Sequence, residues 1–527
     1  MENKSNNGYW VPIVMAVCVT FGLFMGNLLT PERENIFGGG DSRFTKLQEI
    51  VRILDERYVD NVNGDELFEE TIANLLHQLD PHSNYIPAEE LLAMNESIQG
   101  KFGGVGVRFF IIRDTVCITN VLPGSPAMTA GLEAGDKIIE VEGQSITKNI
   151  ENEDVMGLLK GAEGTDVNLT VLRNGQELQK RVVRGSIPVE SVIAAHMITN
   201  DIGYVRIEQF SVVTAQEFGY ATDQLKQQGL KKLIIDLRNN GGGVLTSATD
   251  IVDEFLDADI PIVETRGEHS APYVYKSTSA GTLKDVEVAV LLNANSASAS
   301  EILAGALQDN DRGVIIGRRS FGKGLVQEDF LLRDGSNVRL TIARYYTPTG
   351  RCIQTPYSDD YNAYYEDQLD RYDNGEMYEV DSSLFVDSLK FTTPGGRTVY
   401  GGGGIMPDVF VPYDTTGMSW YFTELRYSTV FNTFAFDYVQ GRRGKWSSPV
   451  QYNTTFEVTD AILKQFTNFA DEEHGIKLIQ DDFNYSKKLI KHVLKAEIAR
   501  QLWVEDGYYQ VFNKGDEDVQ EAIRQLK

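Results

Sequence analysis

The sequence predicts a multidomain α/β protein, and three observations support this. At roughly 100–200 residues per domain, a chain of 527 residues corresponds to about three domains. Apolar residues make up 42% and charged residues 24%, which is typical of a folded globular chain. From about residue 202, apolar strand patterns alternate with helical patterns, which favours a mainly parallel sheet covered by helices.

The predicted order of parts follows from local pattern. It is a membrane helix at the N-terminus, a helical segment, a β-barrel-like domain, an α/β core with a β-rich flank, and a helical C-terminal region. The boundaries that we expect are 1–8 for a cytoplasmic tail, 9–29 for the membrane anchor, 41–96 for the helical segment, 97–185 for the β-rich domain, 186–415 for the core with an insertion at 356–394, and 416–527 for the C-terminal region.

The charge balance excludes one class of partner. The chain has 49 Lys and Arg against 76 Asp and Glu, a net charge of −27. A nucleic-acid backbone is bound by clustered positive charge, so we expect no nucleic-acid partner. The three cysteines form no disulfide framework, and none of the six histidines has the spacing of a metal site, so no metal is expected.

The N-terminal apolar run predicts a membrane anchor. It spans 21 residues without a charge, YWVPIVMAVCVTFGLFMGNLL, from Tyr9 to Leu29. At 1.5 Å per residue this reaches about 31 Å, enough to cross the bilayer core. The alternative is a cleaved signal peptide, but no small-residue cleavage pattern follows. Lys4 before the run and Glu32 after it place the rest of the chain on the extracytoplasmic side.

The remaining elements are predicted from apolar periodicity and turn residues. Residues 43–80 form two helices, and Asn174-Gly175 and Asp334-Gly335 each connect two strands of a hairpin. In the core, strands at 203–210, 231–237, 286–293 and 312–317 alternate with helices at 214–227, 245–256 and 298–309. Residues 356–394 are acidic and rich in Tyr, which indicates a surface insertion.

Two glycine- and serine-rich turns follow predicted core strands. The first, from Asn239 to Gly243, lets the backbone adopt positive φ and turn its N–H groups toward a bound group, although a plain tight turn has the same composition. The second, NANSASASE, leads from a buried strand into a helix, as in a nucleophile elbow. Ser298 lies at the predicted helix start, with Ser296 and Ser300 as competitors. Ser298 and Glu301 also form a capping box, so Ser298 has a purely structural interpretation as well.

A third motif, GRRSFGKGLVQ, starts at Gly317 and resembles a phosphate-binding loop. That loop needs Ser or Thr after its Lys and then a helix, whereas Gly324 and a strand pattern follow Lys323. In a strand, Lys323 and Gln327 point to the same face. A lysine at its ordinary pKa is neutral in only about one molecule in 10³ near pH 7, so Lys323 acts as a base only if burial lowers its pKa. The alternative is a solvated surface lysine.

Taken together, these motifs resemble a known family. The order DLRNNGGG, SASASE and FGKGLVQ is similar to that of the carboxy-terminal processing peptidases, which are Ser-Lys proteases with an internal PDZ domain. The resemblance covers about residues 43–415 and includes LDPHSNYIPAEE, FGGVGV and GGRTVYGGGGIMPDV. The long acidic insertion and residues 416–527 depart from the family pattern.

The resemblance implies roles for individual residues. It makes Ser298 the nucleophile, Lys323 the general base and Gln327 the residue that orients the lysine. The oxyanion donors would be the backbone N–H groups of Ala299 and of Gly242, with Gly241 as the next choice. The β-rich domain would be the PDZ domain, and its loop would bind a peptide carboxylate through Gly103, Gly104, Val105, Gly106 and Val107.

The resemblance also implies a function. It predicts a serine endopeptidase, without metal or nucleotide cofactor, that captures free apolar C-termini in its PDZ domain and cleaves extracytoplasmic proteins near their tails. Family members often form oligomers, and the resemblance leaves room for a homo-oligomer and for an adaptor or activator protein. The alternative function is a catalytically silent PDZ scaffold that only binds C-terminal peptides.

Overall fold

The computed structural model describes residues 42–148, 150–357, 361–380 and 386–527, so the predicted anchor at 9–29 lies outside the described residues. No helix in the described ranges is both long and apolar enough to cross a membrane. The chain divides into two compact units, residues 1–74 and 75–527. The first unit contains α2 (Ser42–Arg57) and most of α3 (Gly64–His77), which confirms the two predicted N-terminal helices.

The β-rich domain is built around an antiparallel sheet of order β3-β4-β5-β7-β8, with β6 paired to β5. The predicted hairpin joins β7 to β8: Arg173 pairs with Gln176, and Asn174 and Gly175 have φ of 51° and 81°, as a type I′ turn requires. The elements are β3 (Val107–Ile112), β4 (Thr115–Val121), α5 (Pro126–Thr129), β5 (Lys137–Val141), β6 (Gln144–Ser145), α6 (Asn152–Leu159), β7 (Asp166–Arg173) and β8 (Gln176–Val183).

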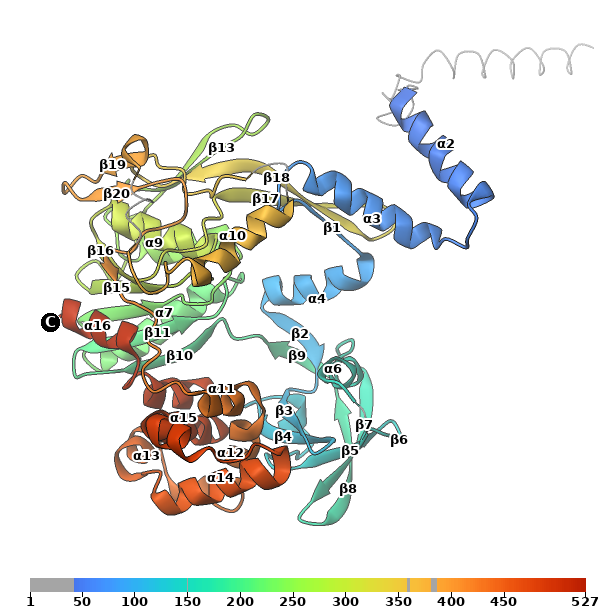
Figure 1. The fold of residues 1–527 in the computed structure, drawn as a ribbon, viewed down its shortest axis with the longest axis vertical. Helices are drawn as coiled ribbons and strands as arrows, with labels where there is room; N and C mark the ends of the chain where they lie inside the picture. The colour runs from blue at the N-terminus through green and yellow to red at the C-terminus, as the bar shows by residue number, and fades with distance from the viewer. Residues whose placement is uncertain (1–41, 149, 358–360, 381–385) are drawn as a thin grey trace, which may run out of the picture. The chain divides into compact units, whose positions relative to one another are not determined.

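The core sheet has the order β10-β11-β12-β15-β16-β21, and all neighbours except β10 and β11 are parallel (Figure 1). This confirms the predicted alternation of strands and helices. The strands are β10 (Val192–Met197), β11 (Ile202–Ile207), β12 (Lys232–Asp236), β15 (Glu287–Leu292), β16 (Gly313–Gly317) and β21 (Val409–Phe410), and the helices between them are α7 (Thr214–Gln227), α8 (Leu245–Asp253) and α9 (Ala299–Asp309).

Alternating residues of each core strand face two different hydrophobic layers. Val205, Leu233 and Val290 pack with the helices α7, α8 and α9 on one face. Tyr204 and Ile234 point to the other face, which is covered by the last helix of the chain. Because successive side chains of a strand point to opposite sides, a run such as Leu233–Ile235 can be apolar throughout only when both faces are buried.

A second sheet borders the core. Its order is β1-β18-β13-β14, with β17 on β18, and the hairpin predicted at Asp334-Gly335 joins β17 to β18. The strands are β1 (Asn84–Ile86), β13 (Pro261–Arg266), β14 (Tyr273–Lys276), β17 (Leu325–Leu331) and β18 (Asn337–Tyr346). The remaining elements of this part are α4 (Ala88–Gln99), the ribbon of β2 (Lys101–Gly104) and β9 (Gly185–Pro188), and, within or next to the insertion, α10 (Tyr361–Asp373), η2 (Asp387–Leu389), β19 (Lys390–Thr392) and β20 (Thr398–Tyr400).

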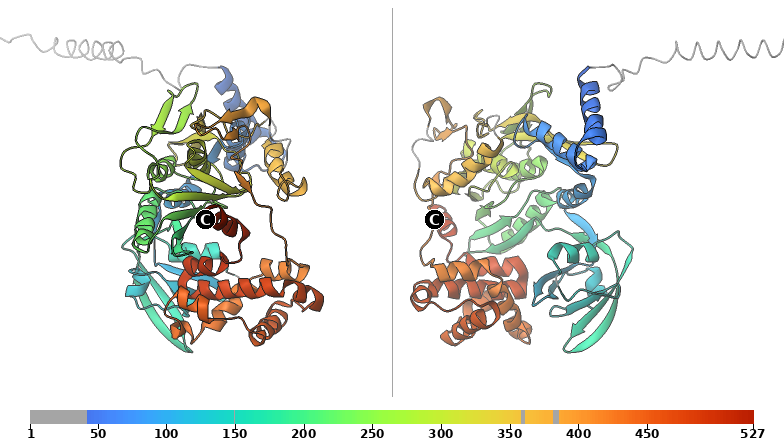
Figure 2. Two further views of the ribbon diagram at one scale, coloured as in Figure 1. Left: turned by 90° about the vertical axis from the view of Figure 1, so that its left-hand side faces the viewer. Right: turned by 45° about the vertical axis from the view of Figure 1, so that its right-hand side comes forward.

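The C-terminal region is helical, as predicted, and has its own core of aromatic and aliphatic side chains. Arg113 of the β-rich domain forms ion pairs with Asp437 and Glu473 of this region, at 2.9 and 2.8 Å. The last helix, α16, leaves the other helices and packs on the core sheet (Figure 2). The helices are α11 (Trp420–Tyr427), α12 (Val430–Val439), η3 (Arg443–Lys445), α13 (Pro449–Thr455), α14 (Asp460–His474), α15 (Gln480–Phe512) and α16 (Glu517–Gln525).

A buried ion-pair network attaches α16 to the core. Arg238, which follows β12, bonds Asp236 and also reaches Asp516 and Asp518 at the start of α16, at 2.9 and 2.8 Å. Arg318, which follows β16, bonds Asp518 at 2.7 Å. All five side chains are largely buried, so each charge depends on its partners for compensation.

Loss of Asp518 should therefore destabilise the fold. Asp518→Ala leaves the Arg318 guanidinium buried with its ion partner removed, and we expect a loss of about 3 kcal/mol in the free energy of unfolding, measured as a lower urea midpoint. Glu517→Ala removes the neighbouring carboxylate, which is about half exposed and 3.7 Å from Arg524, and serves as the control. Equal midpoints for the two variants would show that the network does not secure α16.

Candidate active site

The three sequence motifs meet at one edge of the core sheet. The strands β12, β15 and β16 are neighbours and run parallel, so their carboxyl ends lie side by side. The glycine turn follows β12, the serine turn follows β15, and the lysine loop follows β16. Ligands of open α/β sheets bind at this edge. A cleft of about 490 Å³ opens there, and its lining includes Gly242, Ser298, Lys323 and Gln327.

Backbone geometry separates Ser298 from its two competitors. Ser298 has φ 55° and ψ −113°, a conformation that non-glycine residues rarely adopt and that is typical of a strained strand-to-helix elbow. Ser296 and Ser300 are fully buried, and their hydroxyls donate to the carbonyls of Leu237 and Asn240. Ser298 alone of the three lines the cleft. It also begins α9 as the N-cap of a capping box, so the structural and chemical interpretations are compatible.

The glycine turn is pressed against this elbow. A Cβ on Gly242, whose φ is 100°, would lie 2.7 Å from the Ser298 Cβ and 2.9 Å from the Ala299 nitrogen, so only glycine fits. Asn240 holds the two turns together: its carbonyl accepts the N–H of Ala297, and its amide Nδ2 donates to Ile207.

The positions of the predicted oxyanion donors differ. Ala299 is the first residue of α9, and a first helical N–H has no partner within its own helix. The Gly242 N–H, in contrast, donates to the Asn240 Oδ1 at 2.9 Å, and this bond must break before Gly242 can meet an oxyanion. Gly243 forms a parallel bridge with Phe210. The Phe210 N–H donates to the Gly242 carbonyl, and the Phe210 carbonyl accepts the N–H of Val244. The N–H of Gly243 therefore points away from Phe210.

Lys323 and Gln327 are joined by a hydrogen bond, but not through the strand alternation that was predicted, because Lys323 lies outside β17. The lysine Nζ donates to the Gln327 Oε1 at 2.7 Å, and the Gln327 Nε2 donates to the His82 carbonyl at 2.6 Å. Lys323 precedes β17, and that strand has a register shift between Val326 and Gln327. Because a strand and not a helix follows the lysine, the phosphate-loop interpretation is excluded.

Burial and, to a smaller extent, the positive charge of Arg339 together lower the pKa of Lys323 to about 8. The charges of Asp80 and Glu301 act in the opposite direction but are weaker than burial. At a pKa near 8, about one lysine in ten is neutral at pH 7. In this conformation no hydrogen bond joins the Ser298 hydroxyl to the Lys323 amine, and both groups are within the described residues.

One buried carboxylate holds the backbone of both residues. Glu301 is fully buried, and its Oε2 accepts the N–H of Ser298 at 2.8 Å and that of Lys323 at 2.9 Å. Its Oε1 accepts the N–H of Gly322 and the hydroxyl of Ser320. Burial raises the pKa of this carboxyl, whereas the four hydrogen bonds lower it. The capping-box pattern shows only the first of these contacts, so the sequence did not reveal this wider role.

Tyr345 makes the matching contact on the carbonyl side. Its buried hydroxyl lies 2.6 Å from the Lys323 carbonyl oxygen and 3.1 Å from that of Ser298, and its proton is shared between them. Glu301 and Tyr345 therefore hold the same two residues, Glu301 through their N–H groups and Tyr345 through their carbonyls. No local pattern pointed to Tyr345 beyond its position in an apolar strand pattern.

The LDPHS loop supports Gln327 from the far side of the cleft. The Asp80 carboxylate accepts the N–H groups of His82 and Ser83 and the hydroxyls of Ser83 and Thr341. These bonds fix the His82 carbonyl that receives the Gln327 amide. Burial and the nearby Lys323 lower the pKa of His82 to about 4, so its imidazole is neutral near pH 7.

The acidic insertion also packs behind the lysine loop. The hydroxyl of Tyr364, on α10, lies 3.1 Å from the His82 Nε2. Arg371 at the end of the same helix donates to the carbonyls of Ser320 and Phe321, which precede Lys323. Part of the insertion is therefore a fixed support of the lysine loop and not only a surface excursion.

A second hollow lies in the β-rich domain. Its volume is about 270 Å³, and its lining includes Val105, Gly106 and Val107 of the predicted carboxylate loop. Gly103 and Gly104, in contrast, belong to β2, where they pair with β9, and do not line the hollow. The predicted loop is thus shorter than the FGGVGV pattern indicated, because its first half forms a strand.

Helix α4 borders both hollows. Ala93 and Glu96 line the hollow of the β-rich domain, Met94 and Ile98 line the cleft at Ser298, and Ser97 lines both. At its far end, Glu96 forms an ion pair with Lys160 at 2.6 Å. The two hollows thus share α4 as one wall.

Comparisons with known proteins agree with this arrangement. Residues 201–362 match the model of peptidase family S41, residues 117–173 match that of the PDZ domain, and residues 421–505 match a family of unknown function, DUF8443. A carboxy-terminal-processing protease of Bartonella bacilliformis is 38% identical over 320 residues, which are 59% of this chain and 72% of that protein.

Two further similarities are more distant. A probable CtpA-like serine protease of Staphylococcus aureus is 32% identical over 314 residues, which are 59% of this chain and 63% of that protein. A solved structure of the photosystem II D1 C-terminal processing protease has 25% sequence identity and a TM-score of 0.35, and the match covers 70% of this chain and 93% of that one.

The chain is a serine-type peptidase with a PDZ domain, and it belongs to peptidase family S41, with the carboxy-terminal-processing proteases. The predicted family and the α/β core with its PDZ domain are thus confirmed. Its substrates are accordingly peptides or proteins.

The position of Tyr345 generates a test of the site geometry. Tyr345→Phe removes the hydroxyl that bridges the two carbonyls but keeps the ring, so we expect the fold to persist and kcat to fall about tenfold, as one lost hydrogen bond of 1–1.5 kcal/mol would cause. Tyr346→Phe, one residue further along β18, is the control. An unchanged kcat for Tyr345→Phe, with a peptide substrate at saturation, would contradict a positioning role.

Proposed function

We propose that this peptidase uses Ser298 as nucleophile and Lys323 as general base, and that its substrates are proteins whose free, apolar C-termini enter the PDZ domain. The observation that supports this most is that a serine in a strained elbow and a lysine of lowered pKa follow two adjacent strands of one sheet. Glu301 and Tyr345, which bond both residues, make this pairing rigid.

The proposed reaction has two halves. Lys323, as the free amine, accepts the Ser298 proton while the serine oxygen attacks the scissile carbonyl, and the ammonium then protonates the leaving amine. A water molecule, deprotonated by Lys323, hydrolyses the acyl-enzyme and regenerates the serine. The N–H groups of Ala299 and Gly243 stabilise the oxyanion, with Gly242 joining only if its bond to Asn240 opens.

Substrate binding must bring the Lys323 amine into hydrogen-bond contact with the Ser298 hydroxyl. In the conformation described here the Lys323 amine is bonded to Gln327, and no hydrogen bond connects it to Ser298. We propose that a tail bound in the PDZ hollow and its upstream segment in the cleft contact α4 together, since this helix lines both. The cleft contains apolar side chains for the segment near the scissile bond: Met94, Ile98, Leu245, Ile302, Leu325 and Val326.

We further propose that residues 9–29 anchor the protein in a bacterial cell membrane, with the peptidase on the periplasmic or other extracytoplasmic side. The uncharged run of 21 residues and the charges that flank it support this topology. Substrates would then be extracytoplasmic proteins cleaved near their tails.

Substitution of the dyad is the primary test of this function. Ser298→Ala and Lys323→Ala should each lower kcat/KM for an unstructured protein with an apolar C-terminus by roughly 10³-fold or more, because residues that act as a unit lose nearly all activity singly. Ser279→Ala and Lys276→Ala, both exposed, are matched controls. Cleavage by Ser298→Ala at the parent rate would refute the nucleophile.

Amidation of the substrate tests capture of the tail. A C-terminal amide removes the negative charge that backbone N–H groups of the PDZ loop would bind, so KM should rise with little change in kcat. The same sequence with a free carboxylate is the control. Equal KM values for the two substrates would show that the PDZ domain does not recognise the terminal carboxylate.

The pH dependence follows from the lowered pKa of Lys323. Because the base must be neutral, kcat/KM should rise with pH and level off above about pH 8. Arg339→Gln removes a positive charge that disfavours the ammonium, so the rise should move to higher pH. Arg333→Gln, at the tip of the same hairpin, is the control. An unmoved or lower midpoint for Arg339→Gln would contradict Lys323 as the titrating group.

A further inference from the structure

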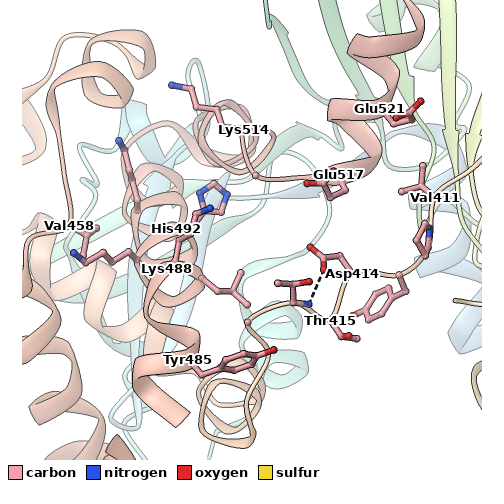
Figure 3. Close-up of a pocket in the computed structure, with 18 of the residues that line it drawn as sticks. Val411, Asp414, Thr415, Val458, Tyr485, Lys488, His492, Lys514, Glu517 and Glu521 are labelled. Carbon is pink, nitrogen blue, oxygen red and sulfur yellow. Dashed lines mark hydrogen bonds between the residues drawn. The ribbon is translucent and has the colours of Figure 1, made fainter. Parts of the chain in front are cut away.

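A third and larger hollow lies away from both peptide sites. Its volume is about 1180 Å³, and its walls are formed by residues 410–417, Glu457 and Val458, one face of α15, and the turn before α16 with that helix (Figure 3). None of these residues lines the cleft at Ser298 or the PDZ hollow. The peptidase reaction therefore leaves this hollow without a role.

One wall is basic, in a chain whose net charge is −27. Lys488, Lys491 and Lys495 follow one another at spacings of three and four residues along α15, with His492 next to Lys491, and together they cover about 10 Å of its length. Lys514 extends this wall from the turn before α16 (Figure 3). We call these five residues the basic wall.

The members of the basic wall lie close together. Burial lowers the pKa of His492, and the charges of Lys495 and Lys488 lower it further. Burial lowers the pKa of Lys495, and the positive charge of Lys514, in the turn before α16, lowers it as well. Like charges at these spacings destabilise a helix, so the wall carries a cost that a bound anion would offset.

The carboxylates nearby compensate only part of this charge. Lys491 pairs with Asp460 at 2.9 Å, and Lys495 lies 3.9 Å from Glu457. Lys488 and Lys514 are exposed and form no ion pair within the described part of the chain. Two ammonium groups at this hollow are thus available to an incoming anion.

The opposite wall is acidic but already paired. Glu517 and Glu521 of α16 both contact Arg524, at 3.7 and 2.6 Å. Asp414, on the segment 410–417, accepts the N–H of Thr416 at 2.8 Å. These carboxylates therefore repel an anion less than free ones would, and the basic wall remains the favourable side of the hollow.

We propose that this hollow binds a phosphate-bearing ligand, with its phosphate at Lys488, Lys495 and Lys514. Ammonium groups that approach from two elements suit a tetrahedral anion with three oxygens, whereas a planar carboxylate is matched best by a guanidinium fork. The hollow is larger than a phosphate ion needs, and Tyr413 and Tyr485 offer exposed rings to the rest of the ligand. The site is independent of the proposed peptidase mechanism.

Calorimetric titration of the full chain tests this proposal. The soluble probes are pyrophosphate and glucose 6-phosphate, at about 0.15 M salt so that weak surface attraction is screened. Vesicles of phosphatidylglycerol, with phosphatidylcholine vesicles as reference, test a lipid headgroup by co-sedimentation. We expect at least one probe to bind, and the double variant Lys488→Gln/Lys514→Gln to weaken its Kd by about tenfold or more.

The control has the same change in net charge. Lys464→Gln/Lys477→Gln removes two exposed lysines of the same helical region that do not line the hollow, and its Kd should match that of the parent. Binding of soluble probes alone identifies a soluble phosphate ester as the ligand, and binding of vesicles alone identifies a lipid headgroup. The proposal is wrong if no probe binds the parent, or if both double variants weaken binding equally.

Discussion

The buried carboxylate of Glu301 is the interaction on which the rest of the site depends. It accepts the backbone N–H groups of Ser298 and Lys323, which belong to loops after two different strands. A fully buried carboxylate is costly unless its oxygens are satisfied, so the structure that satisfies them is strongly favoured. These bonds hold Ser298 in its strained backbone conformation, because Glu301 binds its N–H and Tyr345 binds its carbonyl.

Hydrogen bonds and ion pairs also connect distant parts of the chain to this site. Arg238, two residues beyond the end of the buried strand β12, joins the glycine turn to the last helix through Asp516 and Asp518. The LDPHS loop, more than 200 residues before Gln327, fixes the amide that holds Lys323. The insertion adds Arg371 behind the lysine loop. The C-terminal region and the insertion, which depart from the family pattern, thus support the edge of the core sheet that carries Ser298 and Lys323.

Local signals in the sequence were sufficient for much of the fold and for part of the site. The turns Asn174-Gly175 and Asp334-Gly335 and helix 214–227 follow from short-range rules, and the structure confirms each. Tyr345, the role of Glu301 beyond its cap, and the bond that occupies Gly242 depend on contacts between segments far apart in the chain, which no local pattern encodes. The hollow beside the basic wall depends on such contacts too, because only the fold brings residues 410–417 and 457–458 to α15 and α16.

The most direct test of the central claim is a crystal structure of the full chain with a peptide boronate that carries an apolar residue at the reactive end. The account predicts a bond from boron to the Ser298 Oγ, a boronate oxygen within hydrogen-bond distance of the Ala299 N–H, and the Lys323 Nζ moved into contact with the Ser298 Oγ. Glu301 and Tyr345 should keep their present bonds. A boronate attached to another residue, or bound to Ser298 with Lys323 remote from its oxygen, would contradict the account.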